Sequence, residues 1–177
     1  MHSKESIILF DAVDKTNTDK TIDMVLNYCS THIDVSMILV SSTTGFTAFK
    51  LLSKLRNLNI KELFVFTQYL DEKHNMSDDV HKNLKALELV QDIFYVPEKY
   101  LNQEIGQSGV NSLRELSHGI KVCIEIVHYA QTKQLLKEGK KFIVIAGRVE
   151  GADTAVVFKK KKDNVKMIDI LCFSREE

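Results

Sequence analysis

A turn rich in hydroxyl side chains is the segment of this sequence best suited to chemistry. It lies between an apolar run and a helical pattern and contains Ser41, Ser42, Thr43, Thr44, Gly45, Phe46 and Thr47. The first backbone N–H groups of a helix have no partner within it, and the helix dipole favours a negative charge there. Glycine also lets the backbone approach a ligand closely. The turn therefore predicts a phosphate site. A plain helix cap at Thr43 or Thr44 is the alternative, and spacing leaves both open.

A second polar segment follows the apolar run 141–146 and contains Gly147, Arg148, Gly151, Asp153 and Thr154. The guanidinium group of Arg148 suits a phosphate or a carboxylate, because it can donate two parallel hydrogen bonds. The two glycines make the segment flexible enough to fold over a ligand. The alternative is an ordinary connecting loop in which Arg148 pairs with Glu150 at the surface.

Two other strand ends carry further candidates, namely Thr67 with Gln68, and Asp11. Ligands of an open α/β sheet bind beyond the carboxyl ends of its strands, which is where these residues are expected. Asp11, like Asp153, is suited to acid–base chemistry or to binding a ligand hydroxyl group.

Lys121 and Glu125 match the four-residue spacing of an ion pair along a helix. We interpret them as such a pair, with a place in the ligand site as the alternative. No nucleophile, base and orienting group stand at a recognisable catalytic spacing, so the residues alone predict no reaction. No cysteine has a neighbouring cysteine or histidine at zinc-ligand spacing, and no metal site is expected.

The intervening residues alternate between strand patterns and helix patterns. Short apolar runs predict strands at residues 6–10, 35–40, 63–67, 92–96 and 141–146, and the first of these runs predicts a buried strand. Helical spacings predict helices at residues 18–32, at 45–56, from Ser77 onward, and at 111–136 with a junction at Gly119. Such alternation implies a mostly parallel sheet covered on both faces. A charged turn at residues 159–162 predicts a final hairpin that adds an antiparallel edge, with a phosphate or partner patch as the alternative use of its lysines.

The composition is that of one globular domain over residues 1–177, with 44% hydrophobic and 27% charged residues. Lys and Arg balance Asp and Glu at 24 each. This balance argues against a nucleic-acid partner, because neutralising phosphates needs a basic surplus. No apolar run reaches the ~20 residues that span a bilayer, so no membrane partner is expected. Three widely separated cysteines and the lack of a signal pattern favour the cytoplasm.

The two polar segments carry a resemblance to the C-terminal domain of pyruvate kinase. Residues 40–48, 51–56 and 64–67 are similar to its effector-loop region, and residues 142–154 lie where it has a second, glycine-rich effector segment. A group of stand-alone relatives, mainly archaeal, is a closer match at residues 42–48, 118–125 and 151–155. The resemblance covers roughly residues 6–160.

This resemblance implies a three-layer α/β/α sandwich with a mostly parallel mixed sheet of about five strands, followed by the C-terminal antiparallel hairpin. It implies a phosphate-binding loop at residues 42–47, with flavin mononucleotide (FMN) or a sugar phosphate as ligand, and it puts His118 close to the ligand loops. The chain departs from the pyruvate kinase domain in two places: Asn57 stands where that domain usually has a proline, and the tryptophan of many second effector segments is absent. A second phosphate would therefore be held differently from that of the pyruvate kinase effector. Pyruvate kinase catalysis is not expected, because a barrel of ~250 residues does not fit in this chain.

Three functions remain, in this order. The first is a module that binds a small phosphorylated ligand. The second is an enzyme, either a flavin-dependent oxidoreductase or one acting on a sugar phosphate, for which Asp11, Arg148 and Asp153 share one sheet edge. The third is a structural or regulatory oligomerisation domain, because the pyruvate kinase relative uses this domain in subunit contacts and a homo-oligomer is therefore expected.

Overall fold

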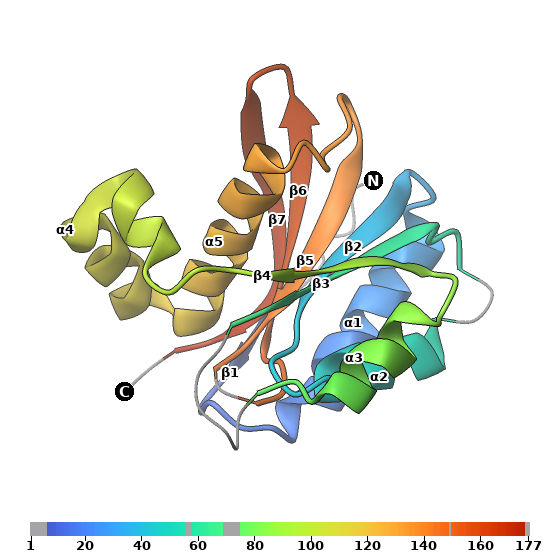
Figure 1. The fold of residues 1–177 in the computed structure, drawn as a ribbon. Coiled ribbons are helices and arrows are strands. Elements are labelled where there is room, and N and C mark those ends of the chain that lie inside the picture. The colour runs from blue at the N-terminus through green and yellow to red at the C-terminus, as the bar shows by residue number, and fades with distance from the viewer. Residues whose placement is uncertain (1–6, 56–57, 69–74, 149, 176–177) are drawn as a thin grey trace.

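A seven-stranded mixed sheet forms the centre of the described chain, which covers residues 7–55, 58–68, 75–148 and 150–175 of a computed structural model (Figure 1). The strands are β1 (Ile8–Phe10), β2 (Val35–Ser41), β3 (Glu62–Thr67), β4 (Val90–Tyr95), β5 (Lys141–Ala146), β6 (Thr154–Lys161) and β7 (Asn164–Ser174). The helices are α1 (Asn17–Thr31), α2 (Phe46–Lys54), α3 (Asp78–Lys85), α4 (Tyr100–Leu116) and α5 (His118–Thr132). Ser6, Arg56 and Asn57, which entered the sequence predictions, lie outside the described residues.

The strand order is β1-β7-β6-β5-β2-β3-β4, and among these strands only β6 runs against the others. The α/β class and the mixed, mostly parallel sheet are therefore confirmed. Because β2, β3 and β5 are parallel neighbours, their carboxyl ends meet at one edge of the sheet. The loops after these three strands are thereby gathered in one place.

Two predictions about the sheet margin are wrong. The final hairpin does not form an edge, because β1 pairs with β7 on its outer side. Nor is the first strand buried, since it contributes only three residues to that edge and leaves Leu9 43% exposed. Its apolar sequence resembles that of an interior strand, but the 11 residues of β7 offer a long free side on which a short strand can pair.

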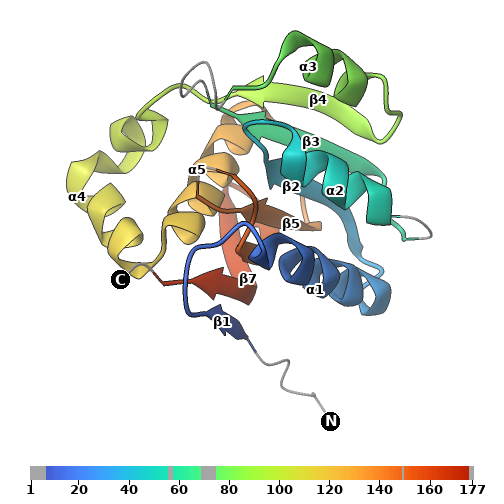
Figure 2. The ribbon, with the colours of Figure 1, turned by 90° about the horizontal axis from the view of Figure 1, so that it is seen from below.

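Helices cover both faces of the sheet, as predicted (Figure 2). Side chains of α1, α2 and α3 pack with Ile38 and Val40 of β2 into one apolar core. Side chains of α5 pack with Met37 and Leu39 of the same strand into a second core on the other face. Successive side chains of a strand point to opposite faces, so a strand buried on both faces must be apolar throughout.

The start of α3 agrees with the prediction, whereas the break between α4 and α5 does not. Ser77 caps α3 as predicted, and its hydroxyl oxygen accepts a hydrogen bond from the Val80 N–H. The predicted helix 111–136 is two helices that break at Ser117, where the backbone is extended and the side chain caps α5. Glycine therefore does not mark the junction. Gly119 lies inside α5, against β6.

We predict that Gly119→Ala destabilises the protein by about 1–3 kcal/mol in urea unfolding, because the new methyl group would overlap the Thr154 hydroxyl and lie 2.6 Å from its Cβ. The matched control is Gly109→Ala in α4, whose methyl group meets only the side chain of Ile105. This control gains helix propensity and is expected to leave stability unchanged or raised. Equal losses in the two variants would contradict the packing role of Gly119.

Candidate functional site

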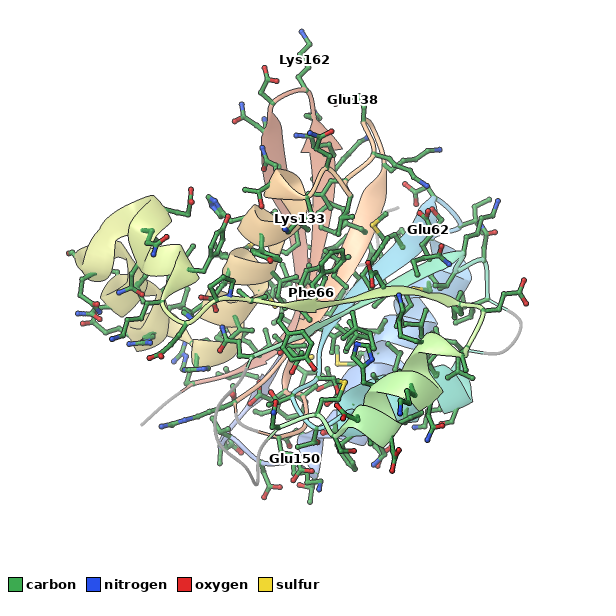
Figure 3. All side chains as sticks on the ribbon, viewed as in Figure 1. Glu62, Phe66, Lys133, Glu138, Glu150 and Lys162 are labelled. Carbon is green, nitrogen blue, oxygen red and sulfur yellow. The ribbon has the colours of Figure 1, made fainter. Side chains whose placement is uncertain are left out.

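A cavity of about 290 Å³ lies at the carboxyl edge of the sheet, beside the first half of α5. Figure 3 shows Glu150, one of its lining residues, at the end of the molecule opposite Lys162 of the hairpin turn. Its wall comprises Ser41, Ser42, Thr43, Thr44, Thr47, Phe66, Thr67, Gln68, Val96, Arg114, His118, Lys121, Val122, Glu125, Ile126, Gly147, Arg148, Glu150 and Gly151. Segments far apart in the sequence thus form one site.

Hydrogen bonds within the hydroxyl-rich turn fix its shape at the start of α2. The Ser42 hydroxyl oxygen accepts from the Ala48 N–H at 3.2 Å, and Thr44 Oγ1 accepts from the Phe46 N–H at 3.4 Å. The N-cap residue of α2 is Gly45, which has no side chain to cap the helix. The predicted cap at Thr43 or Thr44 is therefore present only as the bond from the Phe46 N–H to Thr44, and the sequence does not predict the bond to Ser42. Gly45 adopts φ +89°, and a Cβ there would overlap a methyl group of Val80, so both conformation and space require glycine.

The same turn retains donors that the protein itself does not use. Backbone N–H groups of Thr43, Thr44, Gly45 and Thr47 donate to no acceptor among the described residues. The Thr47 side chain is also without a hydrogen-bond partner within the described ranges, although Thr47 is only 2% exposed and lines the cavity. The turn therefore presents several hydrogen-bond donors that no described residue satisfies.

The second polar segment is tied to α1 rather than left loose. The Thr18 hydroxyl oxygen accepts from the Ala152 N–H at 2.9 Å, and the Thr21 hydroxyl donates to the Ala152 carbonyl at 3.2 Å. Gly151 has φ +89° and packs against Thr18. The predicted flexible loop is therefore held by buried hydrogen bonds, which position the exposed Arg148 at the cavity.

Glu150 joins the two polar segments. It pairs with Lys15 at 2.9 Å and accepts a hydrogen bond from the Thr44 hydroxyl at 3.5 Å. Lys15 in turn lies 4.1 Å from the centre of the Phe46 ring, on the outer side of the turn. Phe46 and Gly45 shape this turn but do not themselves line the cavity.

The buried pair Lys121–Glu125 forms one wall of the cavity, an arrangement that the sequence favours less than a plain helix pair. Their side chains are 8% and 2% exposed, and Lys121 Nζ lies 2.6 Å from Glu125 Oε2. The carboxylate also accepts from Gln68 Nε2 at 3.3 Å and from the Leu101 N–H at 3.5 Å. Exposed ion pairs on helices have the same four-residue spacing. The burial of this part of α5 is therefore what distinguishes Lys121–Glu125 from an ordinary surface pair.

The remaining predicted residues divide into two groups. Ser41, Thr67 and His118 line the cavity with the turn, and the unpredicted Arg114 of α4 joins them. Asp11, Asp153 and Thr154 are not part of its wall. Asp153 is buried, and its carboxylate accepts from the Ser174 hydroxyl at 2.7 Å and the Thr154 hydroxyl at 2.8 Å. These bonds join β6 to the end of β7, and Asp11 lies exposed after β1.

No protein-family model matches this chain. Within the described ranges, no three His, Cys, Asp or Glu side chains are grouped so that they could hold a metal ion. The same residues contain no helix that is long and apolar enough to cross a membrane.

The three cysteines are buried, and burial raises the pKa of their thiols, to about 12 for Cys29 and about 11 for Cys172 and well above the usual value for Cys123. We predict that N-ethylmaleimide labels the native protein slowly at pH 7 to 9, because the reactive thiolate is scarce and covered. Labelling of three sites should become rapid in denaturant. Mass spectrometry counts the adducts, and rapid labelling of native protein would contradict this expectation.

We predict that Lys121→Met destabilises the protein by about 3–5 kcal/mol, because it leaves Glu125 as a buried and uncompensated charge. The control is Lys50→Met, which removes a pair with the half-exposed Asp19 and should cost about 1 kcal/mol or less. Urea unfolding at pH 7 measures both losses. Similar losses of stability in the two variants would contradict the claim that Lys121 compensates a buried charge.

Proposed function

We propose that this protein binds the phosphate group of a small phosphorylated ligand in the cavity, at the turn formed by residues 41–47. The observation that carries this proposal is the Thr47 side chain, which lines the cavity and has no hydrogen-bond partner among the described side chains and backbone groups. The neighbouring backbone N–H groups add further unused donors. A phosphate brings several acceptor oxygens to one place, as this arrangement requires.

The charges around the cavity support an anionic ligand. Arg114, Lys121 and Arg148 line it, against Glu125 and Glu150. The two acidic residues already pair with lysines, Glu125 with Lys121 and Glu150 with Lys15. Helices α2 and α5 both begin at this edge, and the positive ends of their dipoles favour an anion there. A chain with no net charge can thus present a local site for phosphate.

The ligand classes that we propose are a sugar phosphate and FMN. The turn would hold the phosphate of either one. Phe66, Val96, Val122 and Ile126 supply an apolar part of the wall that suits a flavin ring. Flavin, when bound, supplies redox chemistry, but binding alone is what the unused donors support. We place the domain with the pyruvate kinase C-terminal-like α/β/α sandwiches, as a cytoplasmic binding module that forms a homo-oligomer and lacks pyruvate kinase catalysis.

We predict that Thr47→Val weakens binding of inorganic phosphate and of FMN by about tenfold or more, because a hydrogen bond to a charged acceptor is lost. The same variant should be as stable as the wild type or more stable, since Thr47 is a buried residue whose hydroxyl makes no hydrogen bond among the described residues. Isothermal titration calorimetry measures the affinity and urea unfolding measures the stability.

The control is Thr31→Val at the exposed end of α1, which does not line the cavity. Its affinities should equal those of the wild type. Because damage to the fold lowers affinity and stability together, opposite changes in the Thr47 variant identify a ligand contact. Unchanged affinity of that variant for both ligands would contradict the proposed site.

A further inference from the structure

A buried ammonium group with unused donors lies in the same cavity as the turn. Lys121 Nζ can donate three hydrogen bonds, and its one acceptor among the described residues is Glu125 Oε2, at 2.6 Å. Its side chain is only 8% exposed, so bulk water reaches it poorly. Two N–H bonds of a desolvated cation therefore remain without a protein acceptor in the described chain.

The position of this ammonium group is fixed from several sides. Glu125 accepts from Gln68 after β3 and from the backbone of Leu101 in α4, in addition to Lys121. The carboxylate thus joins three segments of the chain and holds the lysine at the cavity wall. A cation held by such a network loses little conformational freedom when a ligand binds, which is the condition for an effective binding group.

We propose that Lys121 is a second ligand contact, which binds a carboxylate or carbonyl oxygen of the ligand whose phosphate lies in the turn. This inference rests on the proposed function and narrows its ligand to phosphate monoesters that also carry such an oxygen. A group that only accepts hydrogen bonds suits the two unused N–H bonds of the ammonium. Glu125, already occupied by three donors, holds the lysine in place.

The size of the cavity is consistent with a compact ligand of this kind. Its volume of about 290 Å³ is at the lower end of the ~300–1,000 Å³ typical of small-molecule sites. The turn and Lys121 line the same volume, so one small molecule is expected to meet both. Phosphoglycolate combines a phosphate monoester with a carboxylate, and dihydroxyacetone phosphate combines it with a carbonyl group. Hydroxyethyl phosphate has neither and is the reference ligand.

The test is isothermal titration calorimetry of these three esters and of inorganic phosphate, with the wild type and with the double variant Lys121→Met/Glu125→Gln. The double substitution removes both charges, so neither is left unpaired. The control is Lys137→Met/Glu62→Gln, which makes the same changes in an ion pair that does not line the cavity. Figure 3 shows Glu62 on the opposite half of the sheet from Glu150.

We expect the wild type and the control to prefer phosphoglycolate, dihydroxyacetone phosphate or both over hydroxyethyl phosphate by about tenfold or more. The double variant should lose this preference and bind the three esters with affinities within about threefold of one another. The ester with the larger preference identifies the group that Lys121 binds. A preference that survives in the double variant overturns the assignment to Lys121.

Two further outcomes separate this inference from the proposed function. A wild type that binds all three esters equally overturns the inference and leaves phosphate binding intact, whereas a wild type that binds neither the esters nor inorganic phosphate overturns both. If the double variant folds poorly, the inference can still be tested by NMR on the wild type alone. Phosphoglycolate should shift the ε-methylene NMR resonance of Lys121 more than hydroxyethyl phosphate does, and equal shifts would contradict the contact.

Discussion

The structure depends on a geometric constraint of parallel sheets: neighbouring parallel strands have their carboxyl ends at the same edge. β2, β3 and β5 end at one edge, and the helices that return the chain begin there. A helix start carries N–H groups that no residue of the helix can satisfy. At α2 the protein uses Ser42 and Thr44 for two of them and leaves others unused within the described chain. The candidate site consists of these remaining donors, held open by the surrounding packing.

The packing around the site depends on residues that other residue types could not replace without strain or overlap. Gly45 and Gly151 occupy the left-handed region, and Gly119 lets α5 approach β6. Thr18 and Thr21 hold the second polar segment through hydrogen bonds to the backbone of Ala152.

Much of this arrangement could be predicted from the sequence. Residues 141–146 match β5 at both ends, and the hydroxyl-rich turn lies at the carboxyl edge of the sheet, where its place between a strand and a helix predicts it. The place of β1 at the sheet edge could not be predicted, because its apolar run is equally typical of an interior strand. Nor could the role of Lys121 and Glu125, since their spacing does not reveal that α5 is covered on that side. In α2 the helical spacing of Phe46, Phe49, Leu52 and Leu55 predicts the wrong buried face. Thr47 and Ala48 are buried, whereas Phe49 is partly exposed.

The most direct test of the central claim is a titration of isotope-labelled protein with inorganic phosphate, followed by amide NMR. We expect saturable shifts that are largest for the N–H groups of Thr43, Thr44, Gly45 and Thr47, since these donors have no acceptor in the described structure. Shifts confined to the lysines of the hairpin turn at residues 159–162, or no saturable shift at all, would contradict the claim.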